Sequence, residues 1–167
     1  MTSFRATVPI VFRPIGIIHT PFRKPEGTPI QPAGGTDVEG WIEIFPEFGE
    51  GLSDLDGFSH LILLYHCNQA KPFQLKVAPF LDDREHGVFA TRSPSRPNPI
   101  GISVVRLMKV GEDRLVIRDL DILDRTPLLD LKPYVPAFDV RECDRIGWLA
   151  DRHENAGTMR DDGRFSS

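Results

Sequence analysis

Short stretches of apolar residues recur along the chain, and their spacing predicts strands more readily than helices. Residues 38–45, VEGWIEIF, alternate apolar and charged side chains, as a strand with one buried face does. Residues 60–66, HLILLYH, are almost continuously apolar and predict a strand buried on both faces. Residues 101–110 and 114–123 flank the tripeptide GED, which predicts a hairpin.

Further short strands are predicted at residues 11–20, 74–80 and 86–92. The 15 prolines oppose long helices and favour short strands joined by structured loops. About seven strands without a clear amphipathic helix predict a mainly β fold, a small closed or partly closed β-barrel with few short helices. The pair Gly34-Gly35 follows no predicted strand and opens no helix, so a Rossmann-like fold is not expected.

Two segments stand out by their polar and turn-forming residues. Residues 28–37, TPIQPAGGTD, form an arm that is long for a hairpin loop, and such loops are usually functional or disordered. Residues 151–167 are polar with few apolar anchors, so we expect a flexible or loosely docked tail. The predicted domain is therefore residues 1–150.

Composition fits an ordinary globular domain. The chain has 167 residues, 40% of them hydrophobic and 26% charged. The sequence shows no apolar run near the roughly 20 residues that span a bilayer and no secretory signal at its start, so we expect a cytoplasmic protein without a membrane partner. Two cysteines are too few for a disulfide framework or a cysteine zinc site.

The distribution of charge bears on whether the protein binds nucleic acid. The net charge of −4 opposes nonspecific coating of nucleic acid. Arginines nevertheless crowd one third of the chain, which is compatible with a local basic patch or with a mixed surface; they are Arg84, Arg92, Arg96 and Arg106.

One loop has an unusual composition. Residues 89–101, FATRSPSRPNPIG, place three prolines within six positions, and each proline restricts its own φ and the residue before it. The loop therefore holds Arg92, Arg96 and Asn98 in a stiff segment between two apolar runs.

Three segments together resemble the TrmO family, also called TsaA-like proteins. They are GFSHLILLYH (57–66), GVFATRSPSRPNPIGISVVRL (87–107) and LDILDRTPLLDLKPYVPAFD (120–139), and the resemblance covers about residues 10–150. It is greatest to the single-domain archaeal branch. The resemblance implies a β-barrel homodimer that uses S-adenosylmethionine to methylate N6 of threonylcarbamoyl-adenosine beside the anticodon of threonine tRNA.

The resemblance also implies a set of cofactor-binding residues. Arg92 would meet the carboxylate of the methionine moiety, because a guanidinium matches a carboxylate in geometry and charge. Gly101 would let the backbone approach the ligand, and Ile102 would line the adenine pocket. The full set is Ile30, Gln31, Pro32, Asn68, Gln69, Arg92, Ile102, Asp124, Arg125, Thr126 and Pro127.

Three of these positions depart from the usual family pattern. Ile30 stands where bacterial members have arginine, and Asn68 where histidine is common. Arg125 stands where glycine is usual, and a positive φ there would cost about 1–2 kcal/mol.

The predicted catalytic residues are Asn98, Asp130, Lys132 and Tyr134. The last three alternate in LDLKPY and would share one face of an extended segment. N6 of adenosine is a poor nucleophile and needs alignment with the methyl group and an acceptor for its proton, which Asn98 or Asp130 can provide. Alternatively, Asp130 and Lys132 form a structural ion pair. Arg96 contacts either tRNA phosphate or a carboxylate of its own fold.

Other classes of function find less support in the sequence. His60 and His66 would lie about 20 Å apart on one strand, so no metal site is expected, and His60 is interpreted as structural. The sequence contains no G-x-S-x-G elbow, which opposes a serine hydrolase. The alternative that stays open is a noncatalytic module that binds S-adenosylmethionine or RNA.

Overall fold

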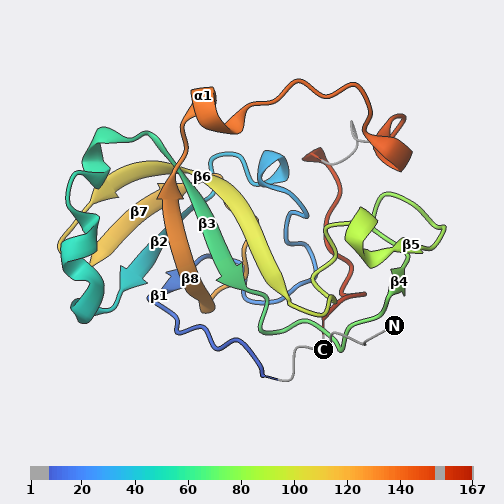
Figure 1. Ribbon diagram of the computed structural model, residues 1–167, viewed down its shortest axis with the longest axis horizontal. Helices are drawn as coiled ribbons and strands as arrows, with labels where there is room; N and C mark the ends of the chain where they lie inside the picture. The colour runs from blue at the N-terminus through green and yellow to red at the C-terminus, as the bar shows by residue number, and fades with distance from the viewer. Residues whose placement is uncertain (1–7, 153–156, 167) are drawn as a thin grey trace.

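Six antiparallel strands close into a barrel in the computed structural model, which describes residues 8–152 and 157–166 (Figure 1). Around the barrel the order is β1-β2-β7-β6-β3-β8, and every neighbouring pair is antiparallel. This confirms the predicted mainly β barrel. The strands are β1 (Gly16–His19), β2 (Glu39–Ile44), β3 (His60–His66), β6 (Ile100–Val110), β7 (Arg114–Arg118) and β8 (Thr126–Pro133).

The helices are all short, as the prolines predicted. Three of them, η1, η2 and α1, begin with a proline, whose fixed φ suits the first helical position. None of the helices in the described ranges has the length and apolar character that a membrane crossing needs. The helices are η1 (Pro32–Gly34), η2 (Pro46–Leu52), η3 (Leu55–Gly57), η4 (Val88–Ala90), α1 (Pro136–Asp139) and η5 (Gly147–Leu149).

The main core fills the barrel. Leu61 and Leu63 of β3 point inward and are fully buried, whereas Ile62 and Leu64 lie outside and are only partly covered. The expectation that residues 60–66 are buried on both faces was therefore wrong, because a closed barrel buries one face of each strand. The fully buried side chains of the barrel core are Ile18, Ile42, Leu61, Leu63, Val105, Leu115, Ile117, Leu120 and Leu128.

Four predicted strands are shorter than expected, and the one predicted over residues 11–20 contributes only β1 (Gly16–His19). Residues 74–80 and 86–92 contribute only β4 (Lys76–Val77) and β5 (His86–Gly87), which pair with each other apart from the barrel. Their apolar residues pack into a second small core instead of extending the strands. This core contains Val77, Val88 and Phe165. The strand predicted over residues 114–123 ends at Arg118, where the next residue has a positive φ.

The arm at residues 28–37 and the last residues of the chain pack together. Pro29 forms an isolated bridge with Arg160, and the N–H of Asp161 donates to the carbonyl of Thr28 at 2.8 Å. A Cβ on Gly35 would lie 1.8 Å from the carbonyl oxygen of Leu120, so the arm can approach the barrel only with glycine there.

The described part of the tail is docked at two further places. Phe165 is buried, and its carbonyl accepts from the N–H of Lys71 at 2.9 Å. Ser166 forms an isolated bridge with Ala70. Whether the tail is flexible in solution stays a prediction. Residues 153–156 and 167 of the tail lie outside the described residues.

Candidate functional site

A cavity of about 490 Å³ opens at the end of the barrel where β3 ends and β6 and β8 begin. The arm forms one part of its wall, and the loops after β3 and before β6 form others. The segment between β7 and β8, the loops around β4 and β5 and two C-terminal segments complete the wall. Segments far apart in the sequence therefore converge on one hollow of the size typical of cofactor pockets.

The structure brings most of the predicted cofactor residues to this cavity. Those that line it are Ile30, Gln31, Asn68, Gln69, Arg92, Ile102 and Thr126. Pro32 follows the lining residue Gln31 and begins η1. The structure thus groups the arm, the loop after β3 and the proline-rich loop around one space.

Three other predicted cofactor residues do not line the cavity. The Asp124 carboxylate accepts the N–H of Thr20 at 3.1 Å and borders a separate, shallower hollow. Pro127 pairs with Ile17 in the ladder between β1 and β8. Arg125 is exposed, and its φ of 62° is the positive value whose cost the sequence analysis gives for this position. The glycine that is usual here would adopt it without strain.

Arg92 joins two walls of the cavity. Its Nη1 donates to Oε1 of Gln31 at 3.1 Å, which links the proline-rich loop to the arm across 61 positions of sequence. The Arg92 side chain is otherwise exposed, so most of its guanidinium donors face the cavity mouth and solvent. A guanidinium has five N–H donors in its plane, and one bond to an amide leaves an edge with two parallel donors for a bidentate anion.

The loop that carries Arg92 is held by hydroxyl groups as well as by prolines. The buried Thr91 hydroxyl donates to the carbonyl of Val88 at 2.8 Å and accepts the N–H of Ser93 at 3.2 Å. Arg96 donates to the carbonyls of Thr91 and Ser93 at 3.2 and 3.4 Å. The hydrogen bonds of Arg96 are therefore to the backbone of its own loop, and within the described residues it makes no ion pair with a carboxylate.

A chain of hydrogen bonds that the sequence analysis missed runs along the cavity floor. The hydroxyls of Tyr65 and Ser103 lie 3.0 Å apart, and Ser103 Oγ donates to Oδ1 of Asp121 at 2.7 Å. Because Ser103 gives its proton to the carboxylate, it accepts the proton of Tyr65. Tyr65 and Asp121 both line the cavity. One signal was available in the sequence: Ser103 is a polar residue at an inward position of the alternating strand β6.

The environment of this chain shifts the ionisation of its members. Burial raises the pKa of Asp121 from its ordinary value of 3.8 to about 6, although the hydrogen bond from Ser103 and the charge of Arg92 oppose the rise. Burial and the neighbouring Asp121 raise the pKa of Tyr65 well above its usual range. Burial also raises the pKa of Cys67 to about 11, so this thiol is protonated at neutral pH, as expected of an inert cysteine.

Gly101 has a packing role that the sequence did not indicate. A Cβ at this position would lie 2.1 Å from the ring of Tyr65. The missing side chain therefore makes room for Tyr65, which pairs with Gly101 across β3 and β6. Gly101 also lines the cavity, and its approach to a ligand stays a prediction. The absence of a side chain at Gly101 leaves space for the Tyr65 ring, whose hydroxyl lies 3.0 Å from Ser103 Oγ.

The predicted catalytic residues do not line the cavity. Asn98 is exposed, and its carbonyl accepts the N–H of Ile100 at 2.7 Å. Asp130 and Lys132 form an ion pair at 2.6 Å, which was the structural alternative for this pair. Tyr134 packs edge-on against His60 with ring centroids 6.3 Å apart, and the interpretation of His60 as a structural residue is consistent with this contact.

Asp130 and Lys132 belong to an outer face of the barrel that adjoins the cavity. They lie opposite Leu64 and Ile62 of β3, and these in turn lie opposite Ile102 and Val104 of β6. Residues directly opposite in antiparallel strands share a face. The apolar residues of this outer face, exposed or partly exposed, are Ile62, Leu64, Ile100, Ile102, Val104 and Met108. Since Ile102 also lines the cavity, the face continues into the cavity mouth.

The fold is a small closed β-barrel domain with a cavity at one end of the barrel, lined by charged and apolar residues. Residues 17–140 match the family of the tRNA-methyltransferase O N-terminal domain, which is well over half of the chain. The chain therefore belongs to this family, and the resemblance noted in the sequence is confirmed.

Individual relatives agree with this assignment. A probable S-adenosyl-L-methionine-binding protein of Pyrococcus abyssi is 59% identical over 158 residues, which cover 95% of this chain and 86% of that protein. A tRNA (adenine(37)-N6)-methyltransferase of Mus musculus is 34% identical over 95% of this chain and 38% of its own length.

A crystal structure of TrmO from Pseudomonas aeruginosa superposes with a TM-score of 0.72 at 38% identity, covering 88% of this chain and 64% of that chain. The present chain thus spans less than two thirds of that solved protein.

Proposed function

We propose that this protein is an S-adenosylmethionine-dependent methyltransferase that modifies N6 of an adenine in tRNA. The observation that carries the proposal is the position of Arg92. The family's proline-rich loop places this guanidinium at the mouth of the cavity, where six other predicted cofactor residues also lie. The names of the Pyrococcus abyssi and mouse relatives support the same cofactor and the same reaction.

The cavity suits the charges of the cofactor. The methionine moiety carries a carboxylate, an ammonium and a sulfonium, and Arg92 supplies a cation for the first of these. Asp121 supplies an anion close enough for the charge of Arg92 to lower its pKa. Ile30 and Ile102 offer apolar wall for the adenine ring. The cofactor, when bound, supplies the electrophilic methyl group.

The protein's own contribution to the reaction is alignment and proton removal. The lone pair of an adenine N6 is delocalised into the ring, so the amine has to be held in line with the methyl group and lose a proton. Among the described residues of the cavity, the carboxylates are Asp121 and Asp161. Asp130 lies on the outer face beside the mouth, where an entering base would pass.

A homodimer formed through the outer face would place the cavity mouth at the subunit interface. The exposed residues Ile100, Ile102 and Val104 form an apolar row, which Arg106 separates from Met108 on the same face, and Ile102 belongs to both surfaces. A second copy seated there would cover this row and bring its own surface to the cavity mouth. Light scattering should give twice the chain mass of 18.8 kDa. Val104→Lys should give the monomer, and a monomeric unaltered protein would contradict the dimer.

The finer substrate that we propose is threonylcarbamoyl-adenosine beside the anticodon of threonine tRNA, as the family resemblance implies. Incubation with methyl-labelled cofactor and tRNA tests the activity, because label should enter an adenosine and disappear with Arg92→Ala. Cofactor binding without any transfer to tRNA would favour the noncatalytic binding module instead.

A further inference from the structure

A C-terminal segment outside the matched family domain forms part of the cavity wall. Trp148 and Leu149 of η5 line the cavity, although the match to the family ends at residue 140. Phe80, Leu81 and Ala90, from the loops around β4 and β5, line it as well. The segment 147–152 must therefore be held against these loops for the wall to exist.

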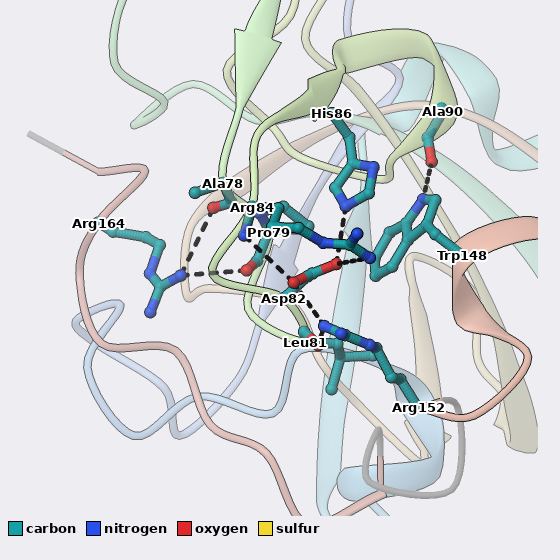
Figure 2. Close-up of polar contacts among 10 residues, drawn as sticks. All are labelled: Ala78, Pro79, Leu81, Asp82, Arg84, His86, Ala90, Trp148, Arg152 and Arg164. Atoms are coloured by element: carbon teal, nitrogen blue, oxygen red, sulfur yellow. Dashed lines mark hydrogen bonds and ion pairs between the residues drawn. The ribbon is translucent and has the colours of Figure 1, made fainter.

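A buried carboxylate links the two parts. Asp82 is only 3% exposed at its side chain, and it accepts from Nε2 of His86 at 3.0 Å (Figure 2). Nη1 of Arg152, from the C-terminal segment, pairs with the same carboxylate at 2.5 Å and also donates to the carbonyl of Leu81 at 3.2 Å. Arg84, from the loop of Asp82 itself, contributes a longer contact of 3.4 Å. We call Asp82, Arg84, His86 and Arg152 the Asp82 cluster.

The charge of Asp82 is secured by this cluster. Burial by itself would raise the pKa of Asp82, but the donors of His86, Arg84 and Arg152 hold it well below its usual range. Leaving a buried carboxylate without a partner strongly destabilises a folded protein, so the ion pair between Asp82 and Arg152 holds together two segments 70 positions apart in the sequence.

Trp148 is oriented by the same group of residues. Its Nε1–H donates to the carbonyl of Ala90 at 2.8 Å. Its indole stacks on the imidazole of His86, with centroids 4.5 Å apart and planes at 21°. Figure 2 shows the hydrogen bond between His86 and Asp82. Through this bond the carboxylate fixes the imidazole on which the indole of Trp148 stacks.

We propose that Asp82 is a positioning residue that holds Trp148 and Leu149 as a wall of the S-adenosylmethionine site, so that the bound cofactor contacts a segment outside the family domain. This inference rests on the proposed function, since it takes the cavity to be the cofactor site. Asp82 acts through Arg152, which anchors the segment, and through His86, which supports the indole.

Fluorescence of Trp148 tests the contact directly. The chain has two tryptophans, and the other, Trp41, stacks on His19 in the separate shallow hollow. In Trp41→Phe, addition of S-adenosylmethionine should change the emission of Trp148 and saturate with the Kd found by calorimetry. Unchanged emission, together with clear binding heat, would overturn the inference. Absence of binding heat in the unaltered protein would instead overturn the proposed function.

A pair of matched variants tests the positioning role. Arg152→Met removes the cation that crosses between the segments, whereas Arg84→Met removes a cation from within the loop of Asp82. Arg152→Met should weaken S-adenosylmethionine binding at least about fivefold and abolish the Trp148 response, while Arg84→Met should stay within about twofold. Equal affinities for the two variants would contradict the proposal.

Substitutions of the carboxylate and the indole complete the test. Asp82→Asn should behave like Arg152→Met, and Asp83→Asn, which removes an exposed neighbouring charge, should behave like the unaltered protein. Trp148→Ala should lose affinity, and Trp148→Phe should recover most of it because a flat ring still covers the wall. Full affinity in Trp148→Ala would overturn the proposal even if Asp82→Asn does not fold.

Discussion

Replacing Asp121 with asparagine should stabilise the free protein at neutral pH and weaken its binding of S-adenosylmethionine. The carboxylate lies in the cavity floor, and burial raises its pKa from 3.8 to about 6. Its ionised form is therefore disfavoured in the folded chain. Asparagine keeps an oxygen that accepts from Ser103 but carries no charge.

The magnitude follows from the pKa. A rise from 3.8 to about 6, at about 1.4 kcal/mol for each pKa unit, corresponds to about 3 kcal/mol of unfolding free energy. The folded protein binds this proton more tightly than the unfolded chain does. Its contribution to stability is therefore fully present below about pH 4 and is lost as the pH rises through about 6. The advantage of Asp121→Asn should grow over that window by about 2–3 kcal/mol.

Denaturant unfolding of both proteins between pH 4 and pH 8 measures this difference, and Asp83→Asn is the control for loss of an exposed carboxylate. Calorimetry at pH 7.5 should show affinity for S-adenosylmethionine reduced about tenfold or more, because the cationic groups of the ligand lose their counter-charge. A stability difference that does not vary with pH, or unchanged affinity, would refute the reasoning.

Three further substitutions test other parts of the site. Arg92→Ala should weaken cofactor binding by about 1.5–3 kcal/mol, the range for a charged hydrogen bond, and calorimetry that gives unchanged affinity would remove Arg92 from the site. Gly101→Ala should lower the unfolding free energy by about 1–3 kcal/mol, because the new Cβ meets the ring of Tyr65, whereas Gly57→Ala enters open space and should change it by less than about 0.5 kcal/mol. Equal effects of the two glycine substitutions in urea unfolding would contradict the packing argument. Arg125→Gly should raise thermal stability by relieving a φ of 62°, a gain of about 1 kcal/mol. A salt slope of tRNA affinity that also falls by about one would identify Arg125 as a phosphate contact, and an unchanged slope would exclude that role.

Much of the barrel could be predicted because its strands carry local patterns. Residues 60–66 form β3 as expected, and the turn at GED joins β6 to β7. The strand predicted over residues 86–92 is limited to β5 (His86–Gly87). Val88 is instead buried against Phe165, a partner that lies 77 positions away and that no local pattern indicates.

The residues of the site also differ in how far local sequence indicates them. Arg92 could be identified from its own loop, where prolines and hydroxyls provide the rigidity locally. The chain from Tyr65 through Ser103 to Asp121 depends on the register of three segments and could not be deduced from any one of them. Asp130 and Lys132 alternate in sequence as predicted, but whether their face meets the cavity or the outside is decided by barrel closure.

The most direct test of the central claim is the mass of the modified nucleoside. Threonine tRNA that carries threonylcarbamoyl-adenosine should be incubated with the protein and S-adenosylmethionine, digested to nucleosides and analysed by mass spectrometry, with tRNA lacking the threonylcarbamoyl group in parallel. We predict one added methyl group on the adenine of the modified nucleoside, absent when Arg92→Ala replaces the unaltered protein. Unmethylated nucleosides in both tRNAs, from a protein that binds the cofactor in calorimetry, would contradict the claim that this cavity serves methyl transfer to tRNA.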